Sequence, residues 1–271
     1  MQSSFTFFYR CRRESGKKPG KIRKSYMCDL YLLMQIFLES LPISSSGHLD
    51  LLGLSVPWAV DFFAHGPTVL MLIVYFAPTL REFLFSPQCR ASACWHLLVI
   101  LFCAECFTPL FYLLFSFALP RPPLWIGFLC TMLLLFSLRF CRASCSDRVG
   151  FKEAGAVGLM QGIALLPGIS RLASTYTVGR WMGLSASTAF RLSCALQIPL
   201  FAGGAVLGTY ALWRKNELAS FLTPLCLLLI LLACIGAFFL LKLVEKSMER
   251  EWLWLLGFYM IIPFFAALLV H

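Results

Sequence analysis

The stretch CDLYLLMQIFLESLPISSSGH, residues 28–48, decides the fold, because a short apolar run in it ends abruptly at a helix breaker. The run 28–41 is shorter than the roughly 20 apolar residues that a membrane-spanning helix needs. Pro42 lacks a backbone donor and ends the helix, and the serines after it need polar partners that lipid does not supply. A short apolar segment with such a breaker is typical of a re-entrant helix.

The whole chain is too hydrophobic for a soluble protein. Of its 271 residues, 59% are hydrophobic and 13% are charged, and the mean hydropathy is +0.79. A soluble domain carries about a quarter charged residues, and one soluble core cannot hide this much apolar side chain. The composition therefore excludes a soluble enzyme, a disordered chain and a secreted disulfide scaffold, and it predicts a polytopic membrane protein.

The net charge of +10 does not indicate a nucleic-acid partner. Eight of the 23 Lys and Arg residues lie in the segment 10–24, and the others lie singly or in small groups between apolar runs. This is the pattern of loops at a membrane surface. We therefore predict membrane lipids, and no nucleic acid, as partners.

The apolar runs predict the architecture. Eight follow the tail, and six of them are long enough, or nearly so, to cross a membrane; they cover residues 28–41, 51–80, 93–119, 123–140, 154–169, 186–213, 218–244 and 252–270. The short runs 28–41 and 154–169 each end in a breaker. Leu33-Met34-Gln35 and Ile43-Ser44 recur at an offset of 126 residues, which favours an internal duplication.

We therefore expect an all-α polytopic membrane protein with six spanning helices and two re-entrant helical hairpins. Residues 27–271 would form a single membrane domain made of two inverted repeats, about 27–140 and 141–271. The two re-entrant hairpins are expected to enter from opposite faces and to meet near the middle of the bilayer.

Basic residues predict the orientation. Loops 81–92, 139–152 and 242–251 fall on one face and carry nine Lys and Arg residues, against three in the opposite loops. Cytoplasmic loops are enriched in Lys and Arg, so Met27 is predicted to lie outside. The basic tail 1–26 contradicts this count. We interpret it as an extension from a mis-assigned start, with a lipid-surface anchor as the alternative.

Two polar clusters at membrane depth are candidates for function, because such groups are costly there. The run 39–48 holds a carboxylate, four hydroxyls and an imidazole, and the run 167–171 combines a Gly-Ser turn with Arg171. The alternatives are an interfacial loop whose serine caps a helix, and an arginine that reaches the interface. A guanidinium and backbone N–H groups bind phosphate oxygens, while a hydroxyl attacks phosphorus and His48 or Glu39 moves protons.

The clusters resemble two motifs of the undecaprenyl-diphosphate phosphatase family, the bacitracin-resistance proteins. Residues 39–49 resemble the family motif EFLPISSTGHL, and residues 166–171 resemble the motif IPGTSRSG. The similarity covers the chain from Met27 and continues through Thr175, Gly179, Gly183-Leu184-Ser185, Arg191-Leu192-Ser193 and Pro199.

This resemblance implies a multi-pass hydrolase of the bacterial plasma (inner) membrane. It would convert undecaprenyl diphosphate, a polyprenyl diphosphate lipid, to undecaprenyl phosphate, the carrier for cell-wall precursors. It implies catalysis by Glu39, Ser44, Ser45, His48 and Arg171; substrate binding by Ser46, Gly168, Ser170, Arg171 and Thr175; and binding of a divalent cation, Mg²⁺ or Ca²⁺, by Glu39 with Gln35 as a weak ligand. A homodimer is a further partner to be tested.

The chain departs from the family pattern at two places. Gln35 stands where the family usually has a first glutamate, so metal affinity should weaken because an amide oxygen carries no charge. Leu172-Ala173 replaces the Ser-Gly that follows the motif arginine. These departures bear on the rate and the metal dependence, and they leave the reaction class in place.

Several alternatives stay open. Ser45 is the preferred nucleophile because it lies three residues before His48, and attack by a metal-bound water with Glu39 as base is the competing mechanism. A lipid-phosphate transporter or flippase of the same architecture, or an inactive paralogue, would also fit. Asp61 and His65 lie four residues apart, and we favour a packing or lining role for His65 over catalysis.

Overall fold

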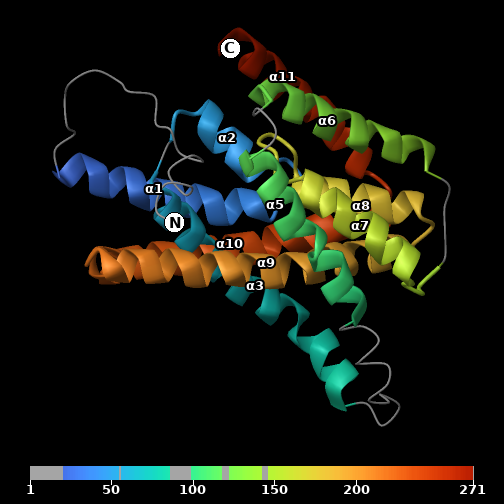
Figure 1. Cartoon of the computed structure of the whole chain (residues 1–271), viewed down its shortest axis with the longest axis horizontal. Coiled ribbons are helices and arrows are strands. Elements are labelled where there is room, and N and C mark those ends of the chain that lie inside the picture. Colours follow the sequence, from blue (N-terminus) through green and yellow to red (C-terminus); the bar gives the residue numbers. More distant parts are fainter. Residues whose placement is uncertain (1–20, 55, 86–98, 118–121, 142–145, 271) are drawn as a thin grey trace.

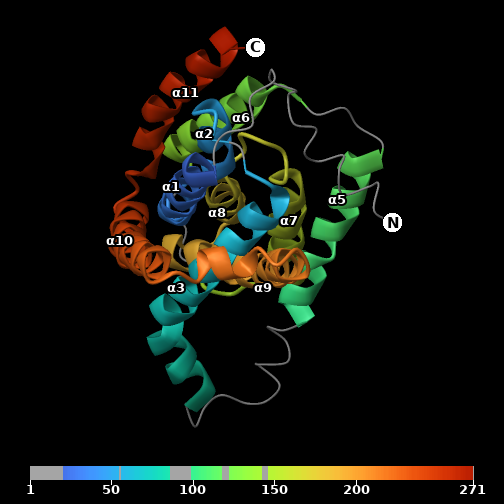
Figure 2. The same ribbon diagram turned by 90° about the vertical axis from the view of Figure 1, so that its left-hand side faces the viewer.

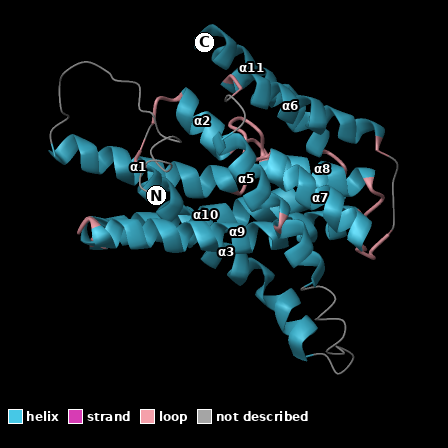
Figure 3. Cartoon of the chain, in the orientation of Figure 1, coloured by secondary structure: helices cyan, strands magenta, loops and turns pink. Residues whose placement is uncertain are grey.

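The computed structural model describes residues 21–54, 56–85, 99–117, 122–141 and 146–270. Every regular element in this part of the chain is a helix (Figures 1 and 3). The helices are α1 (Lys21–Glu39), α2 (Ser45–Leu51), α3 (Trp58–Phe85), α5 (Phe107–Phe117), α6 (Leu124–Ser137), α7 (Phe151–Ile163), α8 (Arg171–Trp181), α9 (Ala186–Arg214), α10 (Pro224–Glu249) and α11 (Leu256–Val270). Residues 99–105 are also helical.

Four of the helices are long and apolar enough to cross a membrane. They cover Trp58–Pro78, Ala186–Arg214, Pro224–Glu249 and Leu253–Val270, and two shorter apolar helices cover Val99–Phe115 and Leu124–Phe140. Large apolar side chains on the outer faces, such as Leu231 and Phe239 of α10, are more than half exposed, as expected for contact with lipid. The protein is therefore an all-helical, multi-pass membrane protein, as its composition predicts.

The helix ends follow from local sequence. Pro42 and Pro167 lie in the loops after α1 and α7, where their missing N–H groups break no helix. Serines cap the helices that follow: the Ser44 hydroxyl accepts a hydrogen bond from Gly47 N, and the Ser170 hydroxyl accepts one from Ala173 N. Both short apolar runs therefore form the helix–turn–helix elements that their breakers predict.

The central helix is α8. It contacts α7, α9 and α6, and Figure 2 shows it enclosed by the other helices. α9 packs most extensively against α3, and a Cβ on Gly208 would lie 2.5 Å from Phe63 N, so their backbones touch there. Such small residues allow close approach where lipid supplies no hydrophobic force between helices. The core thus surrounds α8, of whose 11 residues eight are buried.

Candidate active site

The two turns that join α1 to α2 and α7 to α8 meet inside the protein. We call residues 40–44 the first turn and residues 164–170 the second turn. A Cβ on Gly47 would lie 3.0 Å from Gly168 Cα, so α2 touches the second turn directly. Gly168 itself has φ +84°, a conformation that favours glycine. The breakers therefore bring the two motifs together.

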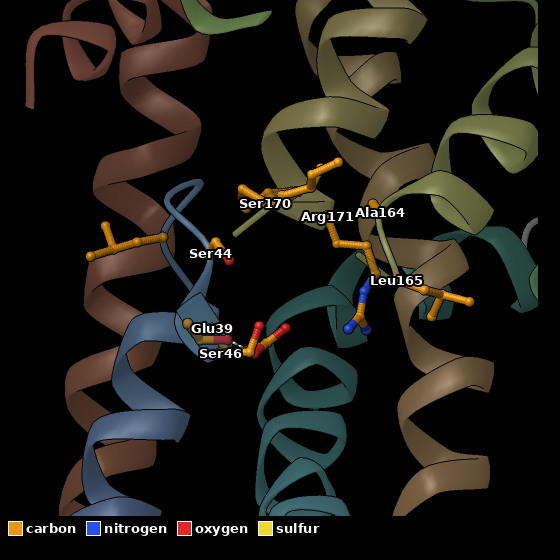
Figure 4. Close-up of a pocket in the computed structure, with 11 residues that line it drawn as sticks. Glu39, Ser44, Ser46, Ala164, Leu165, Ser170 and Arg171 are labelled. Atoms are coloured by element: carbon orange, nitrogen blue, oxygen red, sulfur yellow. Dashed lines mark hydrogen bonds between the residues drawn. The ribbon is translucent and has the colours of Figure 1, made fainter. Parts of the chain in front are cut away.

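A cavity of about 40 Å³ lies where the turns meet (Figure 4). Its polar walls come from both motifs, and Figure 4 shows Glu39 and Ser46 facing the guanidinium of Arg171 across the gap. The lining residues are Glu39, Leu41, Ser44, Ser45, Ser46, Ala164, Leu165, Ile169, Ser170, Arg171 and Leu172. Six of the predicted site residues thus share one cavity.

Glu39 is the centre of the first wall. The Ser45 hydroxyl donates a short hydrogen bond to Glu39 Oε2, and the Gln35 amide donates to the same oxygen over 2.8 Å. Glu39 is half-buried, whereas Gln35 is 1% exposed. A carboxylate bonded to a serine hydroxyl in a cavity is the arrangement in which a base can take the hydroxyl proton.

Ser44 and Ser46 flank that pair in different conformations. Ser44 has φ 66°, a left-handed conformation that a residue with a side chain rarely adopts. Such backbone strain is concentrated at functional sites. Ser46 is the exposed hydroxyl of the cavity, and it extends into the gap (Figure 4). Its oxygen is therefore available to a ligand.

The second wall is held by Thr131 of α6. The Thr131 hydroxyl donates to Gly168 O over 2.9 Å and accepts from Ser170 N over 2.9 Å. These bonds fix both ends of the segment that leads into α8, and Arg171 is the first residue of that helix. The guanidinium of Arg171 therefore starts at a helix N-terminus, where the helix dipole also favours an anion.

Four of the predicted residues lie outside the cavity lining, and Thr175, Gly168 and Gln35 are three of them. Thr175 is fully buried, and its hydroxyl donates to Arg171 O over 2.7 Å. Gly168 shapes the second turn through its backbone conformation. Gln35 lies behind Glu39 and reaches the site through its hydrogen bond to that residue.

His48 is the fourth predicted residue outside the lining. Its Nδ1 lies 2.8 Å from Ser44 O, and its Nε2 lies 3.1 Å from Tyr259 Oη. A carbonyl oxygen can only accept, so Nδ1 carries the proton. In the neutral ring, Nε2 is then the acceptor for the Tyr259 hydroxyl. Both ring nitrogens thus contact groups other than Ser45, and His48 holds the first turn in place.

Comparison with known proteins places the chain in a family. Residues 32–265 match the family described as "Bacitracin resistance protein BacA". The chain belongs to the BacA family. Its curated relatives include the undecaprenyl-diphosphatase of Idiomarina loihiensis, 30% identical over 64% of this chain and 72% of that protein. Two others with the same name are those of Borrelia hermsii, 28% identical over 84% and 92%, and Protochlamydia amoebophila, 31% identical over 71% and 76%.

The BacA match contains the whole cavity. It begins at Leu32 in α1 and ends at Phe265 in α11, so both turns and every lining residue fall within it. The family assignment made from residues 39–49 and 166–171 is therefore confirmed.

The oxygen atoms near Glu39 in this BacA member fit a hard divalent cation that would also bind the phosphates of a substrate. The described residues contain no group of three or more His, Cys, Asp and Glu that could hold a metal. However, Gln35 Oε1 is buried without a hydrogen-bond partner, beside the Glu39 carboxylate. Mg²⁺ is commonly bound by one or two carboxylates together with waters and substrate phosphates. Glu39, Gln35 and the nearby hydroxyls match that pattern.

Sequence reasoning missed three residues that support the site. Thr131 holds the second turn, Tyr259 contacts His48, and Phe201 lies against Arg171. Thr131 carried a signal, because it is a hydroxyl inside the apolar helix α6. Phe201 carried none, since it is one of 26 phenylalanines. Asp61 contacts Tyr31, and His65 stacks on Phe201, which fits the packing role expected for His65.

Proposed function

We propose that this protein is an undecaprenyl-diphosphatase that removes the terminal phosphate of undecaprenyl diphosphate and leaves undecaprenyl phosphate. The observation that carries the proposal is the cavity in which the Glu39–Ser45 pair faces the guanidinium of Arg171. BacA family membership and the names of the curated relatives support it. The product is the lipid carrier that cell-wall synthesis reuses, and the family name connects the activity to bacitracin resistance.

Arg171 binds the diphosphate. Its planar guanidinium can donate two parallel hydrogen bonds to phosphate oxygens, and the unsatisfied N–H groups at the start of α8 add donors of the same sign. Among the described residues, no carboxylate lies within ion-pair distance of Arg171, since the one salt bridge there joins Arg180 to Glu251. The charge of Arg171 is therefore left for the substrate.

The Glu39–Ser45 pair performs the displacement. The Ser45 oxygen attacks the terminal phosphorus, its proton passes to Glu39, and the bridging P–O bond breaks to release undecaprenyl phosphate. Water then hydrolyses the phosphoserine, gives a proton to the site and releases inorganic phosphate. This scheme assigns proton transfer to Glu39 rather than to His48, because Ser45 is bonded to Glu39 and the His48 nitrogens point elsewhere.

The competing scheme has water attack phosphorus directly, with Glu39 as base and Ser45 as a ligand of the phosphate. The variant Ser45→Ala separates the two schemes. It should abolish turnover under the first, whereas a rate of at least about a tenth of normal would end the covalent scheme, because an alanine cannot carry a phosphate.

Glu39 and Gln35 would hold Mg²⁺ or Ca²⁺ at this site, and the cation would neutralise charge on the diphosphate. The buried, unpartnered Gln35 Oε1 supports this assignment. Because one carboxylate is a weak ligand set, the site would need phosphate oxygens of the substrate as further ligands for such a cation.

We further propose that the protein crosses the bacterial inner membrane six times as two inverted repeats, with the cavity open to the extracytoplasmic side. The equivalent positions of Gln35 and Gln161, and of the capping serines Ser44 and Ser170, support the repeats. The excess of basic residues in loops 81–92, 139–152 and 242–251 supports the orientation. The homodimer remains a prediction.

Phosphate release by purified protein tests the function. The wild-type protein in detergent should release inorganic phosphate from undecaprenyl diphosphate, and a chelator should suppress the release reversibly. Arg171→Ala serves as the inactive control in the same detergent. Movement of the intact lipid across vesicles, without release of phosphate, would replace the hydrolase with the transporter alternative.

A further inference from the structure

Arg171 is held in place by an aromatic ring rather than by hydrogen bonds. Its Cζ lies 4.8 Å from the centre of the Phe201 ring, over the ring face, while its Nε is buried without a hydrogen-bond partner. In the described part of the chain, no hydrogen bond or ion pair to its guanidinium is found. A long side chain with so few partners would occupy many rotamers, so the Phe201 contact is the restraint that orients it.

The ring of Phe201 is in turn held by a residue of α3. It is 1% exposed on α9, and the His65 imidazole stacks on it with ring centres 4.5 Å apart and an angle of 2° between the planes. His65, Phe201 and Arg171 thus come from three different helices and join α3, α9 and the start of α8. His65 does not line the cavity, and it reaches Arg171 through the Phe201 ring.

We infer that Phe201 is the positioning residue for the Arg171 guanidinium, and that His65 holds the Phe201 ring in the orientation this requires. The inference rests on the proposed function, in which Arg171 binds the diphosphate. The negative face of a ring attracts a cation without accepting its N–H groups. A carboxylate partner would instead occupy those donors and neutralise the charge that the substrate needs. A ring therefore orients the guanidinium while leaving it free to bind phosphate.

Fluorinated phenylalanines at position 201 test the inference, because fluorine withdraws electron density from the ring with little change in size. From phenylalanine through the mono-, di- and trifluoro forms, kcat/KM should fall stepwise, by roughly tenfold in total, as expected for a cation–π contact in a water-excluded site. Competitive inhibition by inorganic pyrophosphate should weaken in parallel. The thermal midpoints of the fluorinated proteins should fall by no more than a few degrees, because the weakened contact is also part of the folded protein without substrate.

Phe190 supplies the matched control. It is 0% exposed on the same helix, and its aromatic neighbours are Tyr75 and Phe76 rather than Arg171. The same series at position 190 should leave kcat/KM unchanged. A flat series at position 201, in an enzyme that Arg171→Lys inactivates, would overturn the inference and leave the proposed function standing. If Arg171→Lys retains turnover, the phosphate-binding role of Arg171 fails instead.

Discussion

The first turn and the second turn are built on the same plan. Each follows a helix that carries a fully buried glutamine, Gln35 or Gln161, whose amide donates to a carboxylate and whose Oε1 has no partner. Each ends in a serine that caps the next helix, Ser44 or Ser170. The offset of 126 residues between these pairs is the same. A shared backbone plan thus supports both halves of the cavity.

The charged side chains beside the two turns are of opposite sign. The first leads from Glu39 into three hydroxyls, whereas the second leads into Arg171 and the N–H groups of a longer helix. The carboxylate partner also differs, since Gln35 bonds to Glu39 inside the cavity and Gln161 bonds to Glu105, which does not line it. In the proposed function, the first half moves protons and binds the cation, and the second binds the anion.

Removing the charge of Glu39, the residue just before the first turn, should have the largest effect. Glu39→Gln keeps the shape of the side chain but cannot accept the Ser45 proton, so kcat should fall by about 10²- to 10⁴-fold, the range for a general base. Steady-state phosphate release measures the change. Glu105→Gln is the matched control, because its carboxylate occupies the equivalent place beside Gln161 without lining the cavity. Equal losses in the two variants would contradict the proposed division of roles.

The second-largest effect is expected when the guanidinium of Arg171, just after the second turn, is replaced by an ammonium group. Arg171→Lys keeps the charge but loses the two-pronged donor, so kcat/KM should fall by about 10²- to 10³-fold, as for loss of one preorganised donor. Arg180→Lys, on the same helix, is the control, because Arg180 pairs with Glu251 and Leu184 O away from the cavity. Near-normal turnover by Arg171→Lys would remove Arg171 from the phosphate site.

The two turns could be predicted because their sequence signals are local. The residues that hold the turns in place could not be predicted, because they come from distant parts of the chain. Pro42, Pro167 and the serines after them mark breaks in apolar runs, and the breaks are where the structure has them. The duplicated pattern of two short runs with breakers already predicted that the two turns meet near the middle of the bilayer, and the family resemblance then supplied the roles of their residues. The contact of His48 with Tyr259 depends on packing across 211 residues, and no local pattern encodes it.

Replacing each glutamine by glutamate compares the two Gln–Glu pairs, because each variant then has two neighbouring carboxylates. Gln35→Glu and Gln161→Glu each put two carboxylates about 3 Å apart, so both should lower the thermal midpoint in chelator. Mg²⁺ or Ca²⁺ should restore the midpoint of Gln35→Glu, because a bound ion stabilises the folded state by mass action. The Gln35→Glu substitution should also lower the cation concentration needed for half-maximal activity by about tenfold, the effect of one added charged ligand.

The expected difference is that the cation rescues only the first pair. If Gln161→Glu is rescued equally, the second turn also offers a cation site and the two halves are more alike than proposed. An unchanged cation titration in Gln35→Glu, measured by phosphate release and by thermal midpoint, would place position 35 outside the coordination shell.

The smallest expected effect separates the two capping serines by their backbones. Ser44 caps α2 with φ 66°, and Ser170 caps α8 with φ −77°. Glycine replaces a capping serine at a cost of only a few tenths of a kcal/mol, and it adopts positive φ without the cost of about 1 kcal/mol that a side chain incurs. Ser44→Gly should therefore leave the thermal midpoint within about 2 °C of the wild type or raise it. Ser170→Gly gains no such relief and loses backbone entropy, so it should destabilise the protein by about 1 kcal/mol. Thermal unfolding of both variants in one detergent measures the difference, and equal losses would mean that the strain at Ser44 is absent from the folded protein.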